Sequence, residues 1–119
     1  MNNNIILEKS VAFSKRIIKM HQYLKNKNEF VMSNQILRSG TSIGANITES
    51  TRAQSKADFY SKLNIALKEA EETKYWLNLL YSGEYIDNKS FKSISADCEE
   101  IIRILVSITK TQNSYGTEN

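Results

Sequence analysis

Residues that commonly take part in catalysis or metal binding are few and scattered in this sequence. His21 is the single histidine and Cys98 the single cysteine, and the single histidine excludes sites that need two, such as His-rich zinc clusters. Ser107 and Lys110 have Ser-x-x-Lys spacing, but the other motifs of enzymes that use this pair are absent. We interpret His21 and Cys98 as structural residues, and their pairing in a catalytic site is the minor alternative. The sequence predicts a protein that is not an enzyme and has no cofactor or metal.

The basic residues suggest a binding function. The candidates for a nucleic-acid-binding surface are Arg38, Arg52, Lys56, Lys15, Arg16 and Lys19. Arg52 and Lys56 flank the start of a predicted helix, where exposed backbone amides also favour a phosphate group. Such a cluster binds the charged backbone of RNA or DNA without reading its sequence. For Arg38, the alternative is a salt bridge with Glu49 or Glu72.

Charge is unevenly distributed along the chain, although the formal net charge is only +3. Residues 1–62 carry ten Lys or Arg and four Asp or Glu, a net charge of +6, whereas residues 63–119 carry six and nine, a net charge of −3. Three explanations fit this pattern: a nucleic-acid-binding face, attraction between the basic half of one protomer and the acidic half of another, and ordinary solvated helix faces.

The elements that position these residues are predicted to be helices. A hydrophobic content of 40%, no proline and only four glycines favour a single all-α domain. Apolar residues recur at helical spacing over residues 4–25, from 30 or 33 to 49, over 56–82 and from 88 to about 112. We predict an antiparallel up-down four-helix bundle over residues 1–112 and a disordered tail at 113–119.

Capping residues support these boundaries. Ser55 followed by Asp58 is typical of a helix N-terminus, because the hydroxyl accepts from exposed backbone amides and the carboxylate faces the positive helix end. Asp87 or Asn88 is predicted to cap the fourth helix. Gly83 is predicted to end the third helix with left-handed torsion angles.

Two glycines one helical turn apart, Gly40 and Gly44, lie on the same face as Ile36, Ile43 and Ile47. Each glycine costs roughly 0.5–1 kcal/mol of helix propensity relative to alanine. Close packing of a second helix against the missing side chains would offset this cost. A kink near Gly44 is the alternative.

Some apolar residues exceed what one bundle core needs. Leu7, Ile18, Trp76, Leu79 and Ile102 fall beside the main apolar stripes. Because covering a large apolar side chain contributes roughly 1.5–3 kcal/mol, self-association is expected. The sequence contains no apolar run of the ~20 residues that a membrane span needs, and its N-terminus does not resemble a secretory signal. We therefore expect a cytoplasmic protein with no membrane partner.

One stretch contains, in order, Gln35, Arg38, Ser42, Ile43, Ala45, Asn46, Ile47, Glu49, Arg52, Ser55 and Phe59. This order resembles the signature of a bacterial family, the 23S rRNA intervening-sequence or S23-type proteins. The later Gly83, Tyr85 and Ile86 resemble the turn before the last helix of that family, with Glu84 inserted between the first two. Accessory variability determinant proteins of diversity-generating retroelements are similar to the same family.

The resemblance implies a four-helix bundle that assembles into a barrel-like homopentamer. It also implies RNA, DNA or a nucleic-acid enzyme such as a reverse transcriptase as partner. We therefore predict a non-enzymatic, oligomeric bundle that acts on RNA or DNA through a basic surface or serves as accessory to a nucleic-acid enzyme. The alternative is a structural or partner-binding homo-oligomer with no nucleic-acid role.

Overall fold

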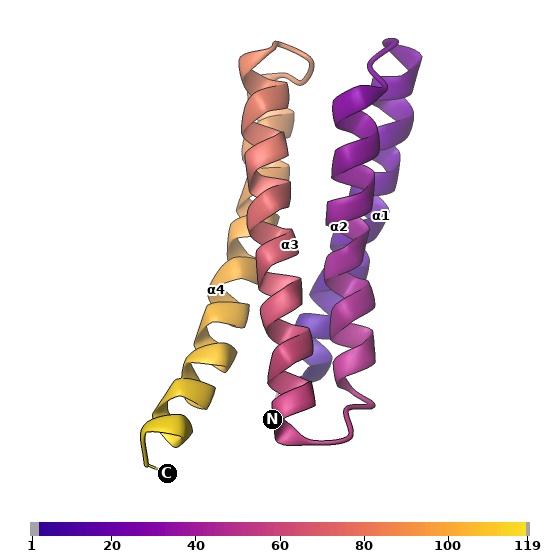
Figure 1. Ribbon diagram of the computed structural model, residues 1–119. Coiled ribbons are helices and arrows are strands. Elements are labelled where there is room, and N and C mark those ends of the chain that lie inside the picture. The colour runs from indigo at the N-terminus through magenta and orange to yellow at the C-terminus, as the bar shows by residue number, and fades with distance from the viewer. Residues whose placement is uncertain (1–2, 119) are drawn as a thin grey trace.

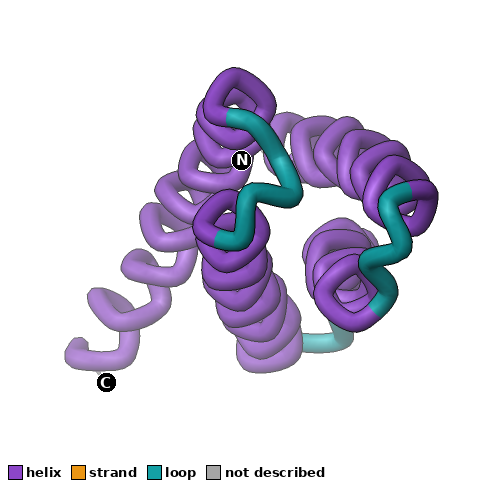
Figure 2. The backbone as a smooth tube through the Cα atoms, turned by 90° about the horizontal axis from the view of Figure 1, so that it is seen from above, coloured by secondary structure: helices purple, strands orange, loops and turns teal. Residues whose placement is uncertain are grey.

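Four helices make up the described part of the chain, which contains no strand. The computed structural model describes the backbone of residues 3–118 and the side chains of residues 5–111. The helices are α1 (Asn3–Asn26), α2 (Val31–Ser50), α3 (Lys56–Ser82) and α4 (Asn88–Glu118). They alternate in direction (Figure 1), and each packs against the next in the sequence, with α4 also contacting α1. Seen from above, the four helices surround a common centre (Figure 2). The predicted all-α antiparallel bundle is confirmed.

The core is a continuous cluster of mainly aliphatic side chains from all four helices. Each of its large members removes apolar surface from water, which contributes roughly 1.5–3 kcal/mol per side chain. The following core side chains are at most 1% exposed: Phe13 and Ile17 from α1, Ile36 and Ile43 from α2, Leu63 and Leu77 from α3, and Ile101 and Leu105 from α4.

The close approach of α1 and α2 at Gly40 confirms the packing predicted for this glycine. A Cβ atom at Gly40 would lie 2.8 Å from Cγ1 and 2.9 Å from Cγ2 of Ile17. A Cβ atom at Gly44 would lie 3.4 Å from the Ser14 hydroxyl, which is ordinary contact. Only Gly40 therefore requires the absence of a side chain, and α2 continues as a helix through both positions.

The turn between α3 and α4 departs from the prediction for Gly83. Gly83 has φ −82°, and the left-handed residue is Glu84, with φ 64°. The backbone N–H groups of Glu84 and Tyr85 donate to the carbonyls of Tyr81 and Leu80, which is the hydrogen-bond pattern of a Schellman motif. A Cβ atom at residue 83 would lie 3.2 Å from Cδ2 of Tyr85, so Gly83 makes room for this ring.

The predicted N-terminal caps of α3 and α4 are present. The Ser55 hydroxyl accepts from the Asp58 N–H at 3.0 Å, and the Asp58 carboxylate accepts from the Gln54 N–H at 3.2 Å. At the start of α4, the Asp87 carboxylate accepts from the Ser90 N–H at 2.7 Å. The chain enters both helices with its first amides partly satisfied.

The backbone of α4 is helical to Glu118. The domain boundary at residue 112 and the disordered tail at 113–119 stay predictions, and residue 119 lies outside the described residues. The segment contains no proline to stop the helix. The last turns of α4 extend away from the other three helices (Figures 1 and 2).

Candidate nucleic-acid interface

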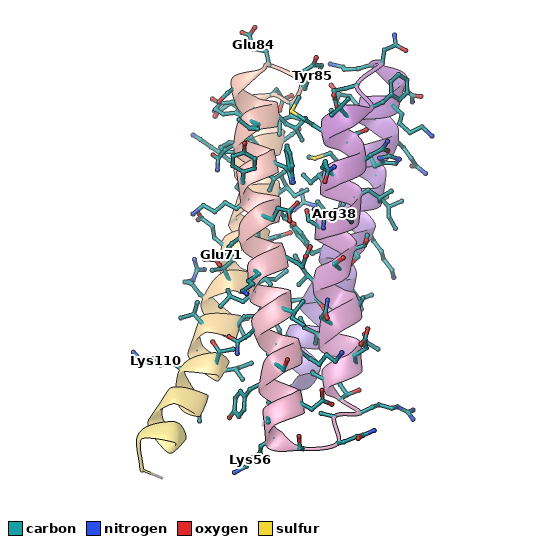
Figure 3. All side chains as sticks on the ribbon, viewed as in Figure 1. Arg38, Lys56, Glu71, Glu84, Tyr85 and Lys110 are labelled. Atoms are coloured by element: carbon teal, nitrogen blue, oxygen red, sulfur yellow. The ribbon has the colours of Figure 1, made fainter. Side chains whose placement is uncertain are left out.

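The six basic residues predicted to bind nucleic acid lie in three separate places. Arg38 lies part-way along α2, whereas Lys56 lies at the end of the bundle where α3 begins (Figure 3). Arg52 is in the α2–α3 connection at the same end as Lys56. The α1 group, Lys15, Arg16 and Lys19, is exposed or half-buried on its helix. The structure thus does not combine all six into one surface.

Arg38 is engaged by acidic residues of α3. Its guanidinium forms salt bridges with Glu69, at 3.1 Å, and with Glu72. Glu72 also accepts a hydrogen bond of 2.9 Å from the Trp76 indole. The salt bridge to Glu72 is one of the alternatives predicted for Arg38, whereas Glu49 pairs instead with Lys62 at 3.0 Å. Arg38 therefore connects α2 to α3.

The α3 N-terminus is already occupied by protein groups. Ser55 and Asp58 cap it, and the Asp58 carboxylate places a negative charge at the positive end of the helix. Arg52 shares a shallow hollow of about 370 Å³ with Glu49, Asp58 and Lys62. In this hollow the charges of Glu49 and Asp58 balance those of Arg52 and Lys62. The α3 N-terminus is therefore a weaker phosphate site than exposed backbone amides alone would provide.

The α1 group divides between a paired and an unpaired part. Arg16 turns toward α4, where it donates to Asp97 at 2.6 Å and to the Ser93 hydroxyl at 2.9 Å. Lys15 and Lys19 are exposed, and within residues 5–111 neither forms a salt bridge. These two lysines are the part of the α1 group that remains available to an external anion; of the other predicted residues, Arg52 is also exposed and forms no salt bridge within residues 5–111.

Salt bridges between helices neutralise much of the charge asymmetry within one protomer. Lys9 pairs with Glu100 at 3.1 Å, in addition to the Arg16–Asp97 pair, and both link α1 to α4. With the pairs of Arg38, they join basic residues of the first half to acidic residues of the second. Each such half-exposed pair contributes only about 0–1 kcal/mol, but the pairs remove basic charge from the outer surface.

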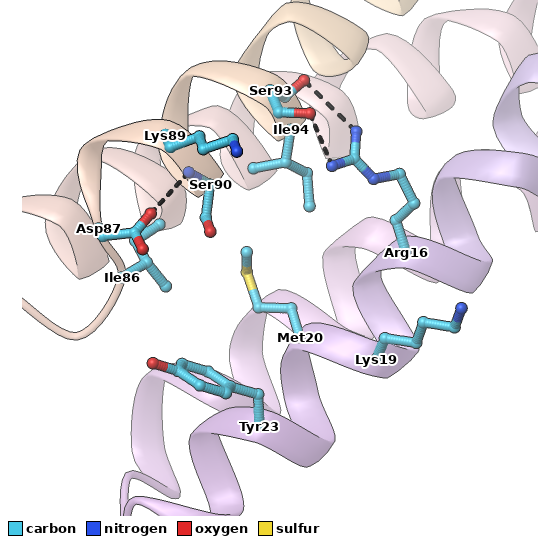
Figure 4. A pocket seen from close by; sticks show the side chains of 10 residues that line it. All are labelled: Arg16, Lys19, Met20, Tyr23, Ile86, Asp87, Lys89, Ser90, Ser93 and Ile94. Carbon is cyan, nitrogen blue, oxygen red and sulfur yellow. Dashed lines mark hydrogen bonds between the residues drawn. The ribbon is translucent and has the colours of Figure 1, made fainter.

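A cleft that the sequence did not predict opens between α1 and the first turns of α4. Its volume is about 680 Å³, within the range typical of ligand sites. Met20 and Ile94 face one another across it, and Tyr23 lies at its end beside Ile86 (Figure 4). The signal in the sequence was weak, because Tyr23 falls off the core stripe of α1 and its neighbours in the cleft come from a distant segment. The one indication of this cleft in the sequence was Tyr23, an aromatic residue outside the core stripe and four residues from Lys19.

The side chains considered for catalysis have structural surroundings. His21 Nδ1 lies 3.1 Å from the Ser33 carbonyl oxygen, in the contact between α1 and α2. Cys98 is buried in the core, where its thiol donates to the Ala70 carbonyl at 3.4 Å. Burial raises the pKa of Cys98 to about 12, so the thiol stays protonated at neutral pH. The structure does not bring His21 and Cys98 together.

Among the described residues, no group of three or more His, Cys, Asp or Glu side chains is placed to hold a metal ion. The helices of the described region also include none that is long and apolar enough to span a membrane.

The fold and this surface define a class: an up-down four-helix bundle with basic residues exposed on its first helix. The chain belongs to the family of 23S rRNA-intervening sequence proteins, whose family model matches residues 2–107. A crystal structure from Bacteroides thetaiotaomicron VPI-5482, described as a protein with unknown function from the S23 ribosomal protein family, has 55% sequence identity and a TM-score of 0.90. The similarity covers 92% of this chain and 99% of that one. The comparison with curated proteins gives no match. The predicted family resemblance is confirmed.

Proposed function

We propose that this protein is a non-enzymatic, oligomeric helical bundle that binds the backbone of RNA or DNA through the exposed surface of α1. The contact residues are Lys15, Arg16 and Lys19, with Lys89 on the facing part of α4. The name of its family refers to a 23S rRNA intervening sequence, which supports structured RNA as the first ligand to test. A nucleic-acid enzyme such as a reverse transcriptase is a further candidate partner.

The observation that carries this proposal is the presence of exposed lysines that have no carboxylate partner. Lys15 and Lys19 lie four residues apart, hence on one side of α1. Lys89 is exposed across the cleft and, within residues 5–111, forms no salt bridge. Arg16 contributes a guanidinium edge beside them. Cations arranged in this way attract phosphates and release the counterions that surround them.

Binding of fluorescently labelled structured RNA, measured by anisotropy at increasing salt, tests the proposal. The unmodified protein should bind at low salt and weaken as salt rises. The double variant Lys15→Gln/Lys19→Gln should bind more weakly and lower the slope of log affinity against log salt by roughly 1–2. The absence of binding at low salt would contradict the proposal.

A matched control removes the same charge elsewhere. Lys68 and Lys110 are exposed lysines on α3 and α4, and their joint change to glutamine should leave the slope unaltered. The pair Arg52→Gln/Lys56→Gln tests the other predicted surface at the α3 end. A loss there that equals the loss at α1 would mean that binding follows net charge and not the α1 surface.

Self-association is the second candidate function, and exposed apolar side chains favour it. Val11 and Ile18, seven residues apart on α1, are 41% and 43% exposed. Ile65 and Leu79 on α3 are 41% and 37% exposed. A second protomer that covers these side chains would bury apolar surface which one bundle leaves in water. On α1 it would also cover Lys15, which lies on the same helix face as Val11 and Ile18, so association through α1 competes with nucleic-acid binding there, whereas association through α3 does not. We propose a homo-oligomer, with five protomers as the family resemblance implies.

A further inference from the structure

We propose that the cleft between α1 and the start of α4 binds an unpaired nucleotide of a nucleic-acid strand, with the base against Tyr23 and Met20 and the phosphate near Lys19 and Lys89. This inference rests on the proposed function and assigns to it a specific site. It adds a preference for single-stranded over duplex segments, which a purely electrostatic surface would not have.

The shape and floor of the cleft suit a flat aromatic group. The buried side chains Ile86 and Ile94 and the half-buried Met20 give it an apolar floor. Figure 4 shows Met20 and Ile94 pointing toward one another from α1 and α4. A volume of about 680 Å³ is sufficient for a small organic group and its attached phosphate. A base that covers this apolar floor would remove its surface from water, which favours binding.

Tyr23 provides an exposed aromatic surface at the end of this cleft. Its side chain is 46% exposed, and it also borders an adjoining hollow of about 400 Å³ that includes Tyr81 and Tyr85. The Lys27 ammonium lies 4.7 Å from the centre of the Tyr23 ring. Exposed aromatic rings interleaved with cations are the recurrent composition of surfaces that bind single strands, because bases stack on the rings while cations follow the backbone.

The charges at the rim favour an anion. Arg16, Lys19 and Lys89 line the cleft, and among the described side chains Asp87 is the single acidic one that does so. Hydrogen bonds from Ser90 lower the pKa of Asp87, and the charges of Lys89 and Lys27 lower it further. Asp87 thus stays ionised at neutral pH, with its carboxylate engaged in capping α4. Because Arg16 is paired with Asp97, the charge at the rim comes from Lys19 and Lys89 against Asp87, which is still net positive.

Base accessibility distinguishes this site from the α1 surface as a whole. In a duplex the base faces are stacked inside, so only phosphates and groove edges reach the protein. A duplex would therefore contact Lys15 and Lys19 without covering Tyr23 or the apolar floor. An unpaired nucleotide can present its base face to Tyr23 and its phosphate to the lysines together.

The test compares a labelled single-stranded oligonucleotide with the duplex of the same sequence, using Tyr23→Ala, Tyr23→Phe and the control Tyr75→Ala. Tyr75 is 56% exposed on α3, so its change matches that of Tyr23 in size and exposure. Tyr23→Ala should weaken single-strand binding roughly tenfold, whereas Tyr23→Phe should keep most of it. Duplex binding should change less than about twofold in all three variants, because phosphate contacts supply it.

The outcomes separate this inference from the function on which it rests. If both ligands bind but Tyr23→Ala weakens neither, or weakens both equally, the nucleotide site is wrong while nucleic-acid binding stands. If neither ligand binds at low salt, both proposals fail. Adenosine monophosphate is the third ligand: weak competition with the bound strand supports the site, whereas its binding without any strand binding would contradict a nucleic-acid occupant. Far-ultraviolet circular dichroism of each variant confirms that the helices remain folded.

Discussion

In the described part of the chain, two residues outside the helices adopt left-handed backbone angles, and their side chains tolerate this conformation to different degrees. Asn28 has φ 63° and Glu84 has φ 64°. Both follow a helix end at which two backbone N–H groups turn back onto helix carbonyls. Asparagine tolerates this conformation better than most residues, whereas for glutamate it costs roughly 1–2 kcal/mol. The α3–α4 turn therefore contains a removable strain.

Replacing Glu84 by glycine should stabilise the protein by about 1 kcal/mol, because glycine adopts left-handed angles without steric cost. Urea unfolding followed by circular dichroism measures the change. Glu84→Gln, which removes the charge and keeps the side chain, should have little effect. Glu71→Gly, made at an exposed position inside α3, should instead destabilise by about 1 kcal/mol. A loss of stability in Glu84→Gly would show that its side chain makes a contribution larger than the strain.

The position of this left-handed residue could not be predicted from residue preferences. Glycine is the usual choice at such a position, so the sequence indicated Gly83. The structure places the left-handed angle one residue later, because the Tyr85 N–H reaches the Leu80 carbonyl at 2.9 Å. Gly83 instead lies against the Tyr85 ring. A local contact with the Tyr85 side chain explains this glycine, and the preferences of single residues do not report which side chain packs against which backbone position.

At the scale of helices, the contact between α1 and α2 depends on one missing side chain. Ile17 is fully buried, and its Cγ1 and Cγ2 atoms would lie only 2.8 and 2.9 Å from the Cβ of an alanine at residue 40. A β-branched side chain in a helix has few alternative rotamers. The two helices would have to separate to admit a methyl group at residue 40, but not at residue 44.

Gly40→Ala and Gly44→Ala should therefore change stability in opposite directions. Overpacking typically costs 1–3 kcal/mol, so Gly40→Ala should destabilise by about 1–2 kcal/mol despite its better helix propensity. Gly44→Ala meets only ordinary contacts and should stabilise by about 0.5–1 kcal/mol. Thermal and urea unfolding of the two variants measure both effects. Equal destabilisation by both would indicate that the approach at Gly44 is tighter than its distances suggest.

The helices were predictable, whereas their rotation relative to one another was not. The capping residues Ser55 and Asp58 placed the start of α3 at Lys56, and periodicity identified Leu63, Leu77 and Leu80 as core, as observed. It could not tell which neighbour a flanking side chain meets. Arg16 faces α4 and Arg38 faces α3, so the ring order of the helices puts them on opposite sides of the bundle. The sequence does not give the rotation of each helix about its axis, so it could not show that Arg16 and Arg38 face different neighbours and do not share one basic surface.

At the scale of the whole molecule, many charges are paired within one protomer, whereas several apolar side chains stay exposed. Basic residues of the first half pair with acidic residues of the second inside a single protomer, as Lys9–Glu100 and Arg16–Asp97 illustrate. Fewer opposite charges are then left to hold copies together. Apolar residues such as Val11 and Ile18 have no equivalent cover. Assembly is thus expected to depend on apolar contact more than on charge.

Light scattering of the protein from low salt to roughly 1 M, where the Debye length falls to about 3 Å, tests this expectation. The mass should stay at a multiple of 13.6 kDa throughout, because salt does not weaken apolar contacts. Val11→Ser/Ile18→Ser should shift the protein toward the monomer, while Lys68→Gln should not. A monomer of the unmodified protein at micromolar concentration, or dissociation as salt increases, would contradict assembly through apolar faces.

The order of the helices around the ring also determines how the chain can reach this structure. Three of the four helix contacts join segments that are consecutive in the sequence, and the remaining one, between α1 and α4, is the smallest and includes two half-exposed ion pairs. Little loop-closure entropy has to be lost before stabilising contacts form. Helical bundles of such local connectivity fold in microseconds to milliseconds. We therefore expect the contact between the first and last helices to form after the contacts between helices that are consecutive in the sequence.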